Sequence, residues 1–190
     1  MPKTDDISEL LGRGVQEIIV RKELEERLRS GDKIKLYLGI DPTGSRLHVG
    51  HAIALRKLRD FQRLGHKVIF LIGNFTALIG DTSDKDSPRQ PMTPQEIEEN
   101  FKTYKKQAGK ILDFSKIELR YNADWLSKLS FKDILDLAGK FTVQQMIERE
   151  MYQRRIKEGK SIGLHEFLYP LMQGYDSVAM DVDLEVGGND

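Results

Sequence analysis

The chain has 190 residues, 39% of them hydrophobic and 32% charged, which suits one packed domain with a charged surface. Its 30 basic and 30 acidic residues cancel, so net charge gives no support to nucleic-acid binding, although a local basic patch would be hidden in the sum. There is no cysteine, which excludes disulfides and cysteine-based zinc sites, and no run approaches the roughly 18 apolar residues of a membrane span. The first residues lack the layout of a secretion signal, so we expect a cytoplasmic protein with no membrane partner.

Helical and strand-like patterns alternate over the first half of the chain. Apolar residues recur at helical spacing over residues 7–29, with Gly31 as a stop signal, and predict a helical segment. The apolar runs at 34–40 and 67–73 predict buried strands, and residues 52–65 predict a helix between them. A strand, a helix and a strand in succession form a βαβ unit, which predicts a parallel sheet with a right-handed crossover.

A polar loop and a well-marked helix start follow the second expected strand. Residues 80–94 are mostly polar and predict the loop. Thr93 then has the character of an N-cap, with Pro94 at the first helical position and Glu96 at the third. A helix is therefore expected from there to about residue 112.

The rest of the chain predicts two more strands and three more helices. The strands are expected at 117–121 and 184–186, and one of the helices covers 165–180. The other two helices begin at capping boxes, formed by Ser130 with Asp133 and by Thr142 with Gln145. The whole pattern predicts an α/β fold with a Rossmann-type open parallel sheet flanked by helices.

Polar or glycine-rich residues follow each of the four expected strands. These segments are residues 41–51, residues 74–81, Asn122, and residues 187–190. In an open α/β sheet, ligands bind beyond the carboxyl ends of the strands. We therefore expect the functional site at this edge of the sheet.

The segment after the first strand has the features of a phosphate site. Asp41 to Gly44 predict a turn, and His48-Val49-Gly50-His51 then opens a helix, whose N-terminus favours phosphate. The absent side chain of Gly50 would let a flat base lie against the backbone, and the two imidazoles could donate to a phosphate. On these four residues alone, the histidines can equally be surface residues or a metal pair, although zinc lacks an obvious third ligand.

A second candidate site lies on the helix expected at 165–180. Tyr169, Gln173 and Asp176 are spaced four and three apart, so they share one helix face among apolar neighbours. Such a polar face either lines a pocket or faces solvent, and periodicity alone favours solvent. Asp81, after Gly80, can likewise be read as a plain turn residue.

Five segments, in order, resemble those of tyrosyl-tRNA synthetases. The segment YLGIDPTGSRLHVGH resembles the family's nucleotide-binding segment, which carries a form of the HIGH motif of class I aminoacyl-tRNA synthetases. The other similar segments are Asn74 to Asp81, Asn122 to Trp125, Tyr169 to Asp176 and Val186 to Asp190. The resemblance covers residues 36–190, and its segments together are far more specific than any one of them.

The resemblance implies the organisation of the chain. Residues 1–190 would be one partial catalytic domain, incomplete at its C-terminus, with residues 1–32 as an N-terminal helical segment. Residues of about 130–160 would be a helical insertion through which family members form homodimers. An apolar stripe there could form the interface or could pack on its own core: Phe141, Met146, Ile147, Met151 and Tyr152. The mobile KMSKS loop and the anticodon-binding domain of the family would be missing.

The resemblance also implies roles for individual residues. Tyr37 and Asp176 would hydrogen-bond the phenol hydroxyl of substrate tyrosine. The α-ammonium group would be held by Asp81, Tyr169 and Gln173, with Thr76 and Asn122 as further pocket residues. The catalytic contacts to ATP phosphates would come from Thr43, His48 and His51. Further residues would border the tyrosyl, adenine and ribose groups: Gly39, Asp41, Gly50, Gly188 and Asp190.

The implied reaction is the activation of tyrosine by ATP, with Mg²⁺ on the ATP phosphates and no metal held by the protein. The product would be tyrosyl-adenylate, from which the full-length enzyme would transfer tyrosine to tRNA(Tyr). Leu38 and Ala54 depart from the common pattern, where small polar residues touch the nucleotide, and the loop after Asp81 also differs.

Three other interpretations remain open at this stage. A tryptophanyl-tRNA synthetase shares the fold, but Tyr37 and Asp176 suit a phenol hydroxyl. A smaller nucleotidylyltransferase also uses an HxGH turn, but it would not need the helix from Tyr169 to Asp176. The third is a binding module without catalysis.

Overall fold

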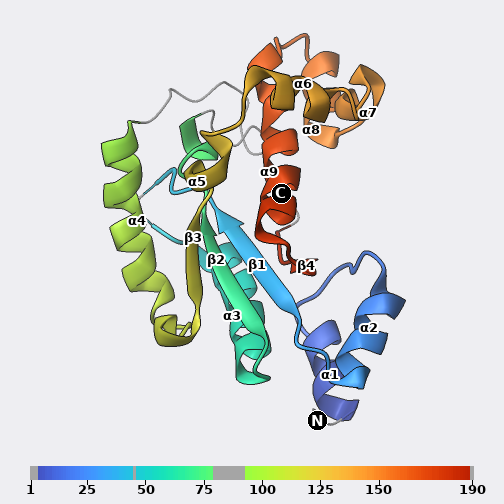
Figure 1. The fold of residues 1–190 in the computed structure, drawn as a ribbon, viewed down its shortest axis with the longest axis vertical. Helices are drawn as coiled ribbons and strands as arrows, with labels where there is room; N and C mark the ends of the chain where they lie inside the picture. Colours follow the sequence, from blue (N-terminus) through green and yellow to red (C-terminus); the bar gives the residue numbers. More distant parts are fainter. Residues whose placement is uncertain (1–3, 45, 79–92, 189–190) are drawn as a thin grey trace.

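The fold centres on a parallel sheet of four strands in the order β3-β2-β1-β4 (Figure 1). It is seen in a computed structural model that describes residues 4–44, 46–78 and 93–188. The strands are β1 Lys35–Ile40, β2 Lys67–Ile72, β3 Glu118–Tyr121 and β4 Leu184–Glu185. Lys35 of β1 lies opposite Lys67 of β2, and Leu36 lies opposite Leu184 of β4. The predicted Rossmann-type parallel sheet is confirmed.

The two faces of the sheet are buried by different helices. Alternate residues of β1 and β2 enter the main core, where they pack against α3 (Val49–Arg63) and α4 (Pro94–Ala108). Tyr37, Ile69 and Leu71 point to the other face, which α9 (Leu168–Met180) covers through Met180. Because both faces are covered, the central strands β1 and β2 read as continuous apolar runs in the sequence.

The helical segment expected over residues 7–29 is confirmed as helical, but it forms two helices and not one continuous helix. These are α1 (Thr4–Gly12) and α2 (Arg21–Ser30), which pack against each other. Gly14 and Val20 both have positive φ, at 67° and 59°, and this ends one helix and precedes the next. The same apolar spacing therefore serves two short helices, and Gly31 ends the second as predicted, with φ 86°.

Other predicted boundaries hold with small shifts. The capping box of Thr93 and Glu96 starts α4 as expected, but the helix ends at Ala108, and a 3-10 turn, η2 (Phe114–Lys116), follows. The helix expected over 165–180 begins as a 3-10 turn, η3 (Leu164–Phe167), before α9. Of the loop expected at 80–94, all but Thr93 and Pro94 lies outside the described residues.

Between β3 and α9 lies a helical insertion made of α5 (Ala123–Leu126), α6 (Phe131–Ala138), α7 (Val143–Ile147) and α8 (Glu150–Lys157). Both predicted capping boxes start helices here. In Figure 1, α6, α7 and α8 form a lobe beyond the carboxyl ends of the strands. The described helices include none that is both long and apolar enough to span a membrane.

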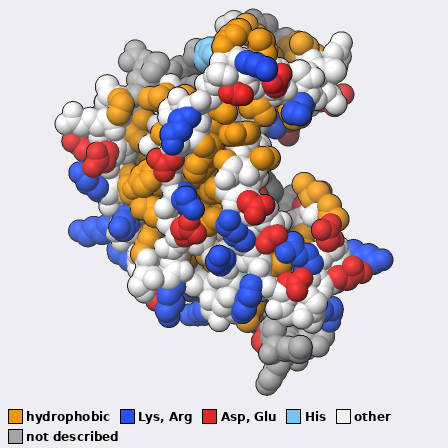
Figure 2. All heavy atoms as spheres, viewed as in Figure 1, with side chains coloured by type: hydrophobic (Ala, Val, Ile, Leu, Met, Phe, Trp, Pro, Cys, Tyr) orange, Lys and Arg blue, Asp and Glu red, His pale blue; other side chains and the backbone are white. Residues whose placement is uncertain are grey.

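The apolar stripe predicted in this insertion does not form one surface. Tyr152 is 0% exposed and packs on Phe167 with ring centroids 4.9 Å apart, and Met146 is 8% exposed. Both side chains therefore belong to the interior, as the alternative reading of the stripe held. Four apolar side chains on the lobe are at least half exposed: Phe131, Leu135, Phe141 and Val143. Figure 2 shows hydrophobic side chains at the surface of this lobe.

Candidate functional site

The carboxyl ends of three strands and one face of α9 meet in a hydrogen-bonded group of polar side chains. Asp41 follows β1, Thr76 lies after β2 in the 3-10 turn η1 (Thr76–Leu78), and Asn122 follows β3. Tyr169 and Asp176 come from α9. We call these five residues, with Trp125 of α5, the strand-end network.

Asn122 is the hub of the strand-end network. Its side chain is buried, with the residue 1% exposed. The amide oxygen accepts from the backbone N–H of Phe75 at 2.9 Å. The amide nitrogen donates to the Thr76 hydroxyl at 3.0 Å and to Asp176 Oδ2 at 3.2 Å. One amide thus fixes the end of β2 relative to α9.

The carboxyl group of Asp176 is buried and held on both oxygens. Besides Asn122, the indole N–H of Trp125 donates to Oδ1 at 2.7 Å. Burial raises the pKa of Asp176 to about 6, while the bonds from Trp125 and Asn122 act in the opposite direction. The carboxylate is therefore mostly ionised at neutral pH and still able to accept a further donor.

Tyr37 supplies a second buried polar group close to Asp176. Its hydroxyl shares a hydrogen bond of 2.9 Å with the Ser177 hydroxyl, and the residue is 1% exposed. Burial raises the Tyr37 pKa above its usual range, and the negative charges of Glu185 and Asp176 raise it further. The Tyr37 hydroxyl thus remains protonated and can donate.

At the other end of the strand-end network, Asp41 is held by two hydroxyl groups. Thr76 donates to Oδ1 at 2.7 Å, and Tyr169 donates to Oδ2 at 2.9 Å. Gly73, which sequence reasoning missed, allows this carboxylate to approach the backbone. A Cβ at Gly73 would lie only 1.7 Å from Asp41 Oδ1. A glycine directly after a buried strand was the available signal.

Not every predicted tyrosine-pocket residue joins the strand-end network. Gln173 is exposed and donates to Glu185 Oε1 at 3.0 Å, so it does not share the burial of Asp176 on the same helix. Asp81 and Asp190 lie outside the described residues, and Gly188 is exposed at the end of them. Trp125, Ser177 and Glu185 were missed as site residues because their roles depend on partners distant in sequence.

The predicted helix start at His48 is confirmed. The ring of His48 caps α3 by accepting from the Gly50 N–H at 3.1 Å, and His51 Nδ1 accepts from the His48 N–H at 3.3 Å. The two ring centroids lie 3.9 Å apart. Thr43 is half-buried in the preceding turn, where its N–H donates to the Asp41 carbonyl at 2.7 Å. We call residues 43–51 the histidine turn.

The His48 ring lies close to Gly50, which was expected to border the nucleotide. A Cβ there would meet the His48 ring at 2.9 Å, so the space over Gly50 is taken up by that ring. A base could lie against this backbone only after the His48 ring turns away. Gly39 is exposed on β1, where a Cβ would make only ordinary contacts. Within the described part of the chain, no three His, Asp or Glu side chains are grouped as metal ligands.

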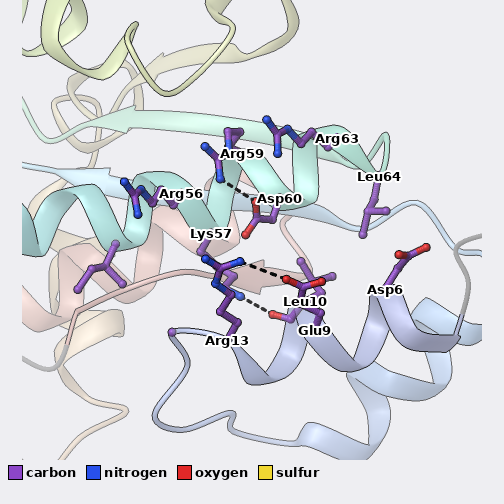
Figure 3. Close-up of a pocket in the computed structure, with 12 residues that line it drawn as sticks. Asp6, Glu9, Leu10, Arg13, Arg56, Lys57, Arg59, Asp60, Arg63 and Leu64 are labelled. Atoms are coloured by element: carbon purple, nitrogen blue, oxygen red, sulfur yellow. Dashed lines mark hydrogen bonds and ion pairs between the residues drawn. The ribbon is translucent and has the colours of Figure 1, made fainter.

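A separate hollow of about 480 Å³ lies between α1 and the C-terminal half of α3 (Figure 3). Two ion pairs lie along it, Arg13 with Glu9 at 3.2 Å and Arg59 with Asp60 at 3.3 Å. Buried Lys57 donates to the Leu10 carbonyl and so joins α3 to α1. The hollow lies at the opposite end of α3 from His48, so it is not part of the strand-end site.

An open parallel sheet with its polar groups beyond the carboxyl ends of the strands is typical of a Rossmann-type ligand-binding domain. A family model described as "tRNA synthetases class I (W and Y)" matches residues 29–190, and the chain belongs to this family.

Two relatives with similar sequences are named as tyrosine–tRNA ligases. The chain is 49% identical over 186 residues to the tyrosine–tRNA ligase of Carboxydothermus hydrogenoformans, covering 96% of this chain and 45% of the relative. It is 46% identical over 194 residues to tyrosine–tRNA ligase 2 of Clostridium acetobutylicum, covering 100% of this chain and 48% of the relative. The chain thus spans about half the length of the relatives it matches.

Solved structures agree with this assignment. A C-terminally truncated mitochondrial tyrosyl-tRNA synthetase from Coccidioides posadasii is 27% identical, with a TM-score of 0.79, over 98% of this chain and 55% of that one. The Archaeoglobus fulgidus tyrosyl-tRNA synthetase complexed with L-tyrosine is 24% identical, with a TM-score of 0.73, over 96% of this chain and 54% of that one. The latter likeness shows the shared fold alone.

Proposed function

We propose that this chain is the tyrosine- and ATP-binding part of a tyrosine–tRNA ligase. The observation that carries the proposal is the pair of buried polar groups, Tyr37 and Asp176, on one side of the sheet. A hydroxyl that donates and a carboxylate that accepts together suit the phenol hydroxyl of tyrosine. The relatives named as tyrosine–tRNA ligases support the same substrate.

The other end of the strand-end network suits the charged end of the amino acid. Asp41 lies there, three hydrogen bonds from Asp176 by way of Thr76 and Asn122, and Tyr169 is bonded to Asp41. A carboxylate and a phenol hydroxyl could both accept from an α-ammonium group. We assign Asp81 and Gln173 to the same end on the resemblance, with Gln173 released from Glu185 when tyrosine binds.

The proposed reaction is attack of the tyrosine carboxylate on the α-phosphate of ATP, with pyrophosphate as the leaving group. The carboxylate is already ionised at pH 7, so no general base is needed. Catalysis then consists of positioning and of stabilising charge on the pentacoordinate phosphate. The donors would be the amides at the start of α3 with Thr43, His48 and His51, beside the Mg²⁺ that ATP carries. Gly39, Gly50, Gly188 and Asp190 would border the nucleotide.

Later steps and partners belong to the longer protein. We propose that a chain as long as the relatives transfers tyrosine to tRNA(Tyr) for protein synthesis, and that it does so in the cytoplasm. We also propose a homodimer, and the exposed apolar side chains on α6, on α7 and between these helices support it: Phe131, Leu135, Phe141 and Val143. Monomers alone in sedimentation at high micromolar concentration would argue against the dimer.

Calorimetry with this chain tests the substrate. We expect it to bind tyrosine and to reject phenylalanine, because phenylalanine would leave the Tyr37 and Asp176 groups without their partner. Tryptophan is the informative competitor, since the matching family includes both specificities. Binding of tryptophan in preference to tyrosine would contradict the proposal.

Tyrosine-dependent exchange of pyrophosphate into ATP tests the reaction. We expect clear exchange by a chain as long as the relatives and feeble exchange by residues 1–190, which lack the expected KMSKS loop. The short chain should not charge tRNA. If residues 1–190 charge tRNA at the rate of the longer chain, the proposal that charging needs the longer chain is wrong.

A further inference from the structure

A buried ion pair joins the insertion to the start of α9. Arg155 of α8 and Glu166 of η3 are 3% and 2% exposed. Their side chains meet through two parallel hydrogen bonds, Nη1 to Oε2 and Nη2 to Oε1, the latter at 3.1 Å. This two-pronged geometry fixes both the distance and the orientation of the partners.

The same two side chains also hold the backbone that leads into α9. Glu166 Oε1 accepts from the Gly163 N–H at 2.8 Å, and Arg155 Nη2 donates to the Ser161 carbonyl. The buried Tyr152 hydroxyl donates to the Glu166 carbonyl at 3.0 Å. Residues 161–167 are therefore tied to α8 at three points: the Glu166 side chain and carbonyl in the interior, and the Ser161 carbonyl at a part-buried position.

The energetics argue that this pair is not there chiefly for stability. Burying two charges removes their hydration, and the attraction between them offsets this only when every polar atom finds a partner. Arg155 Nε is buried and has no hydrogen-bond partner among the described residues. Replacement of such a pair by apolar residues of similar volume is often neutral or stabilising.

The position of the pair gives it another use. Tyr169 follows Glu166 by three residues, about one helical turn, and its hydroxyl must reach Asp41 across the site. Asp176 and Ser177, further along α9, must reach Trp125 and Tyr37. A rotation or sliding of α9 at its start would break these contacts together.

We propose that Arg155 and Glu166 are positioning residues that fix α9 so that its polar side chains meet the ends of the strands. The consequence for tyrosine binding rests on the function proposed above. Among the hydrogen bonds of the described residues, none joins Arg155 or Glu166 directly to the strand-end network. The two side chains act through the backbone of residues 161–167.

Trp125 provides a readout that needs no ligand. It is the chain's single tryptophan, and its indole N–H donates to Asp176 of α9. Its fluorescence and near-ultraviolet circular dichroism should therefore report where α9 lies. The test compares the wild type with Glu166→Gln and with the apolar double variant Arg155→Met/Glu166→Leu. Arg120→Gln is the matched control, since it breaks the exposed Arg120–Glu118 ion pair on β3.

We expect the double variant to keep the thermal midpoint within a few degrees of the wild type, yet to change the Trp125 signal and to bind tyrosine about tenfold more weakly. Glu166→Gln should change both readouts and also lower the midpoint, because it leaves Arg155 without its charge partner. Arg120→Gln should change neither readout. Nucleotide affinity should stay the same in all three variants.

The two proposals fail in different ways. If the wild type binds no tyrosine, the proposed function is wrong, and the Trp125 signal still decides the positioning role. If a folded double variant keeps both the wild-type Trp125 signal and the wild-type tyrosine affinity, the positioning proposal is overturned and the pair only holds the fold together. A double variant that unfolds would also overturn it, because stability would then be the role of the pair.

Discussion

The strand-end network and the histidine turn lie beyond the same edge of the sheet but are built in different ways. Every side chain of the network's centre is buried and bonded to another: Asn122, Thr76 and Asp176 are all at most 3% exposed. In the histidine turn, His48 is exposed, and its ring is occupied with the helix start and with His51. One region is organised before any ligand arrives, and the other must rearrange to receive one.

The difference matches the two ligands proposed. Tyrosine needs a rigid pocket. Phenylalanine, which has no hydroxyl, is rejected because it would leave buried polar groups of the pocket without a hydrogen-bond partner. A triphosphate needs donors that can follow charge as it shifts, and the exposed His48 imidazole at a helix N-terminus can turn toward it. We therefore expect substitutions in the network to affect folding strongly, and substitutions in the histidine turn to affect mainly the reaction.

The largest effect on folding is expected for Asn122→Ala. The change removes three hydrogen bonds and leaves the Phe75 N–H and buried Thr76 and Asp176 short of a partner. The free energy of unfolding should fall by about 3–4 kcal/mol. Urea unfolding followed by circular dichroism measures it. Asn100→Ala is the matched control, since Asn100 makes one part-buried bond, to the Pro42 carbonyl, and should lose about 1 kcal/mol. Equal losses in the two variants would show that Asn122 is no hub.

Asp176 should make stability depend on pH. Its pKa is raised by burial to about 6 from 3.8, so the folded state binds the proton more tightly than the unfolded chain. Its contribution is therefore fully present below pH 3.8 and is lost as pH rises through 6, by about 2–3 kcal/mol.

Asp176→Asn should remove this loss while weakening tyrosine binding. Between about pH 4 and pH 7, the wild type should lose about 2–3 kcal/mol of unfolding free energy relative to Asp176→Asn. Urea unfolding across this range, with calorimetry at pH 7, measures both effects. A constant difference at every pH would mean that the Asp176 carboxyl is not buried as the structure has it.

A smaller effect is expected for Gly73→Ala. The new Cβ would lie 1.7 Å from Asp41 Oδ1, and the short Asp41 side chain is held in place by Thr76 and Tyr169. Overpacking of this kind costs about 1–3 kcal/mol of unfolding free energy. Gly12→Ala is the control, since nothing lies within 4 Å of a Cβ there and it should be nearly neutral. Tyrosine affinity should fall with Gly73→Ala, and an unchanged affinity would remove Asp41 from the pocket.

Local signals explain which parts of the fold could be predicted from the sequence. The capping boxes at Thr93, Ser130 and Thr142 and the βαβ pattern depend on residues close together in the chain, and all are confirmed. The break between α1 and α2 was missed, because apolar spacing is the same for one long helix and for two that pack together. Only the positive φ of Gly14 and Val20 separates them.

The composition of the site was predictable, but its connections were not. Residues after the strands were expected to gather, and Asp41, Thr76 and Asn122 do. Which atoms pair is set by contacts across more than 30 residues of chain, so the role of Trp125 had no local signal, whereas Gly73 had one as a glycine directly after a buried strand. The spacing of the apolar stripe left open whether it forms an interface or packs on its own core, because the packing of Tyr152 depends on Phe167, which comes later in the chain.

The smallest effect on folding is expected in the histidine turn, and it gives the sharpest contrast. His48 caps α3 with its own ring, and asparagine is among the best N-cap residues, so His48→Asn should keep the helix start. Unfolding free energy should change by less than about 0.5 kcal/mol. Adenylate formation by a chain as long as the relatives should nevertheless slow, because each charge-assisted hydrogen bond to the reacting phosphate contributes about 1.5–3 kcal/mol, and tyrosine affinity should be little changed. Single-turnover kinetics beside urea unfolding separates the two quantities. If His48→Asn and His51→Asn both react at the wild-type rate, the histidines serve only to start α3, and the contrast between the two halves of the site disappears.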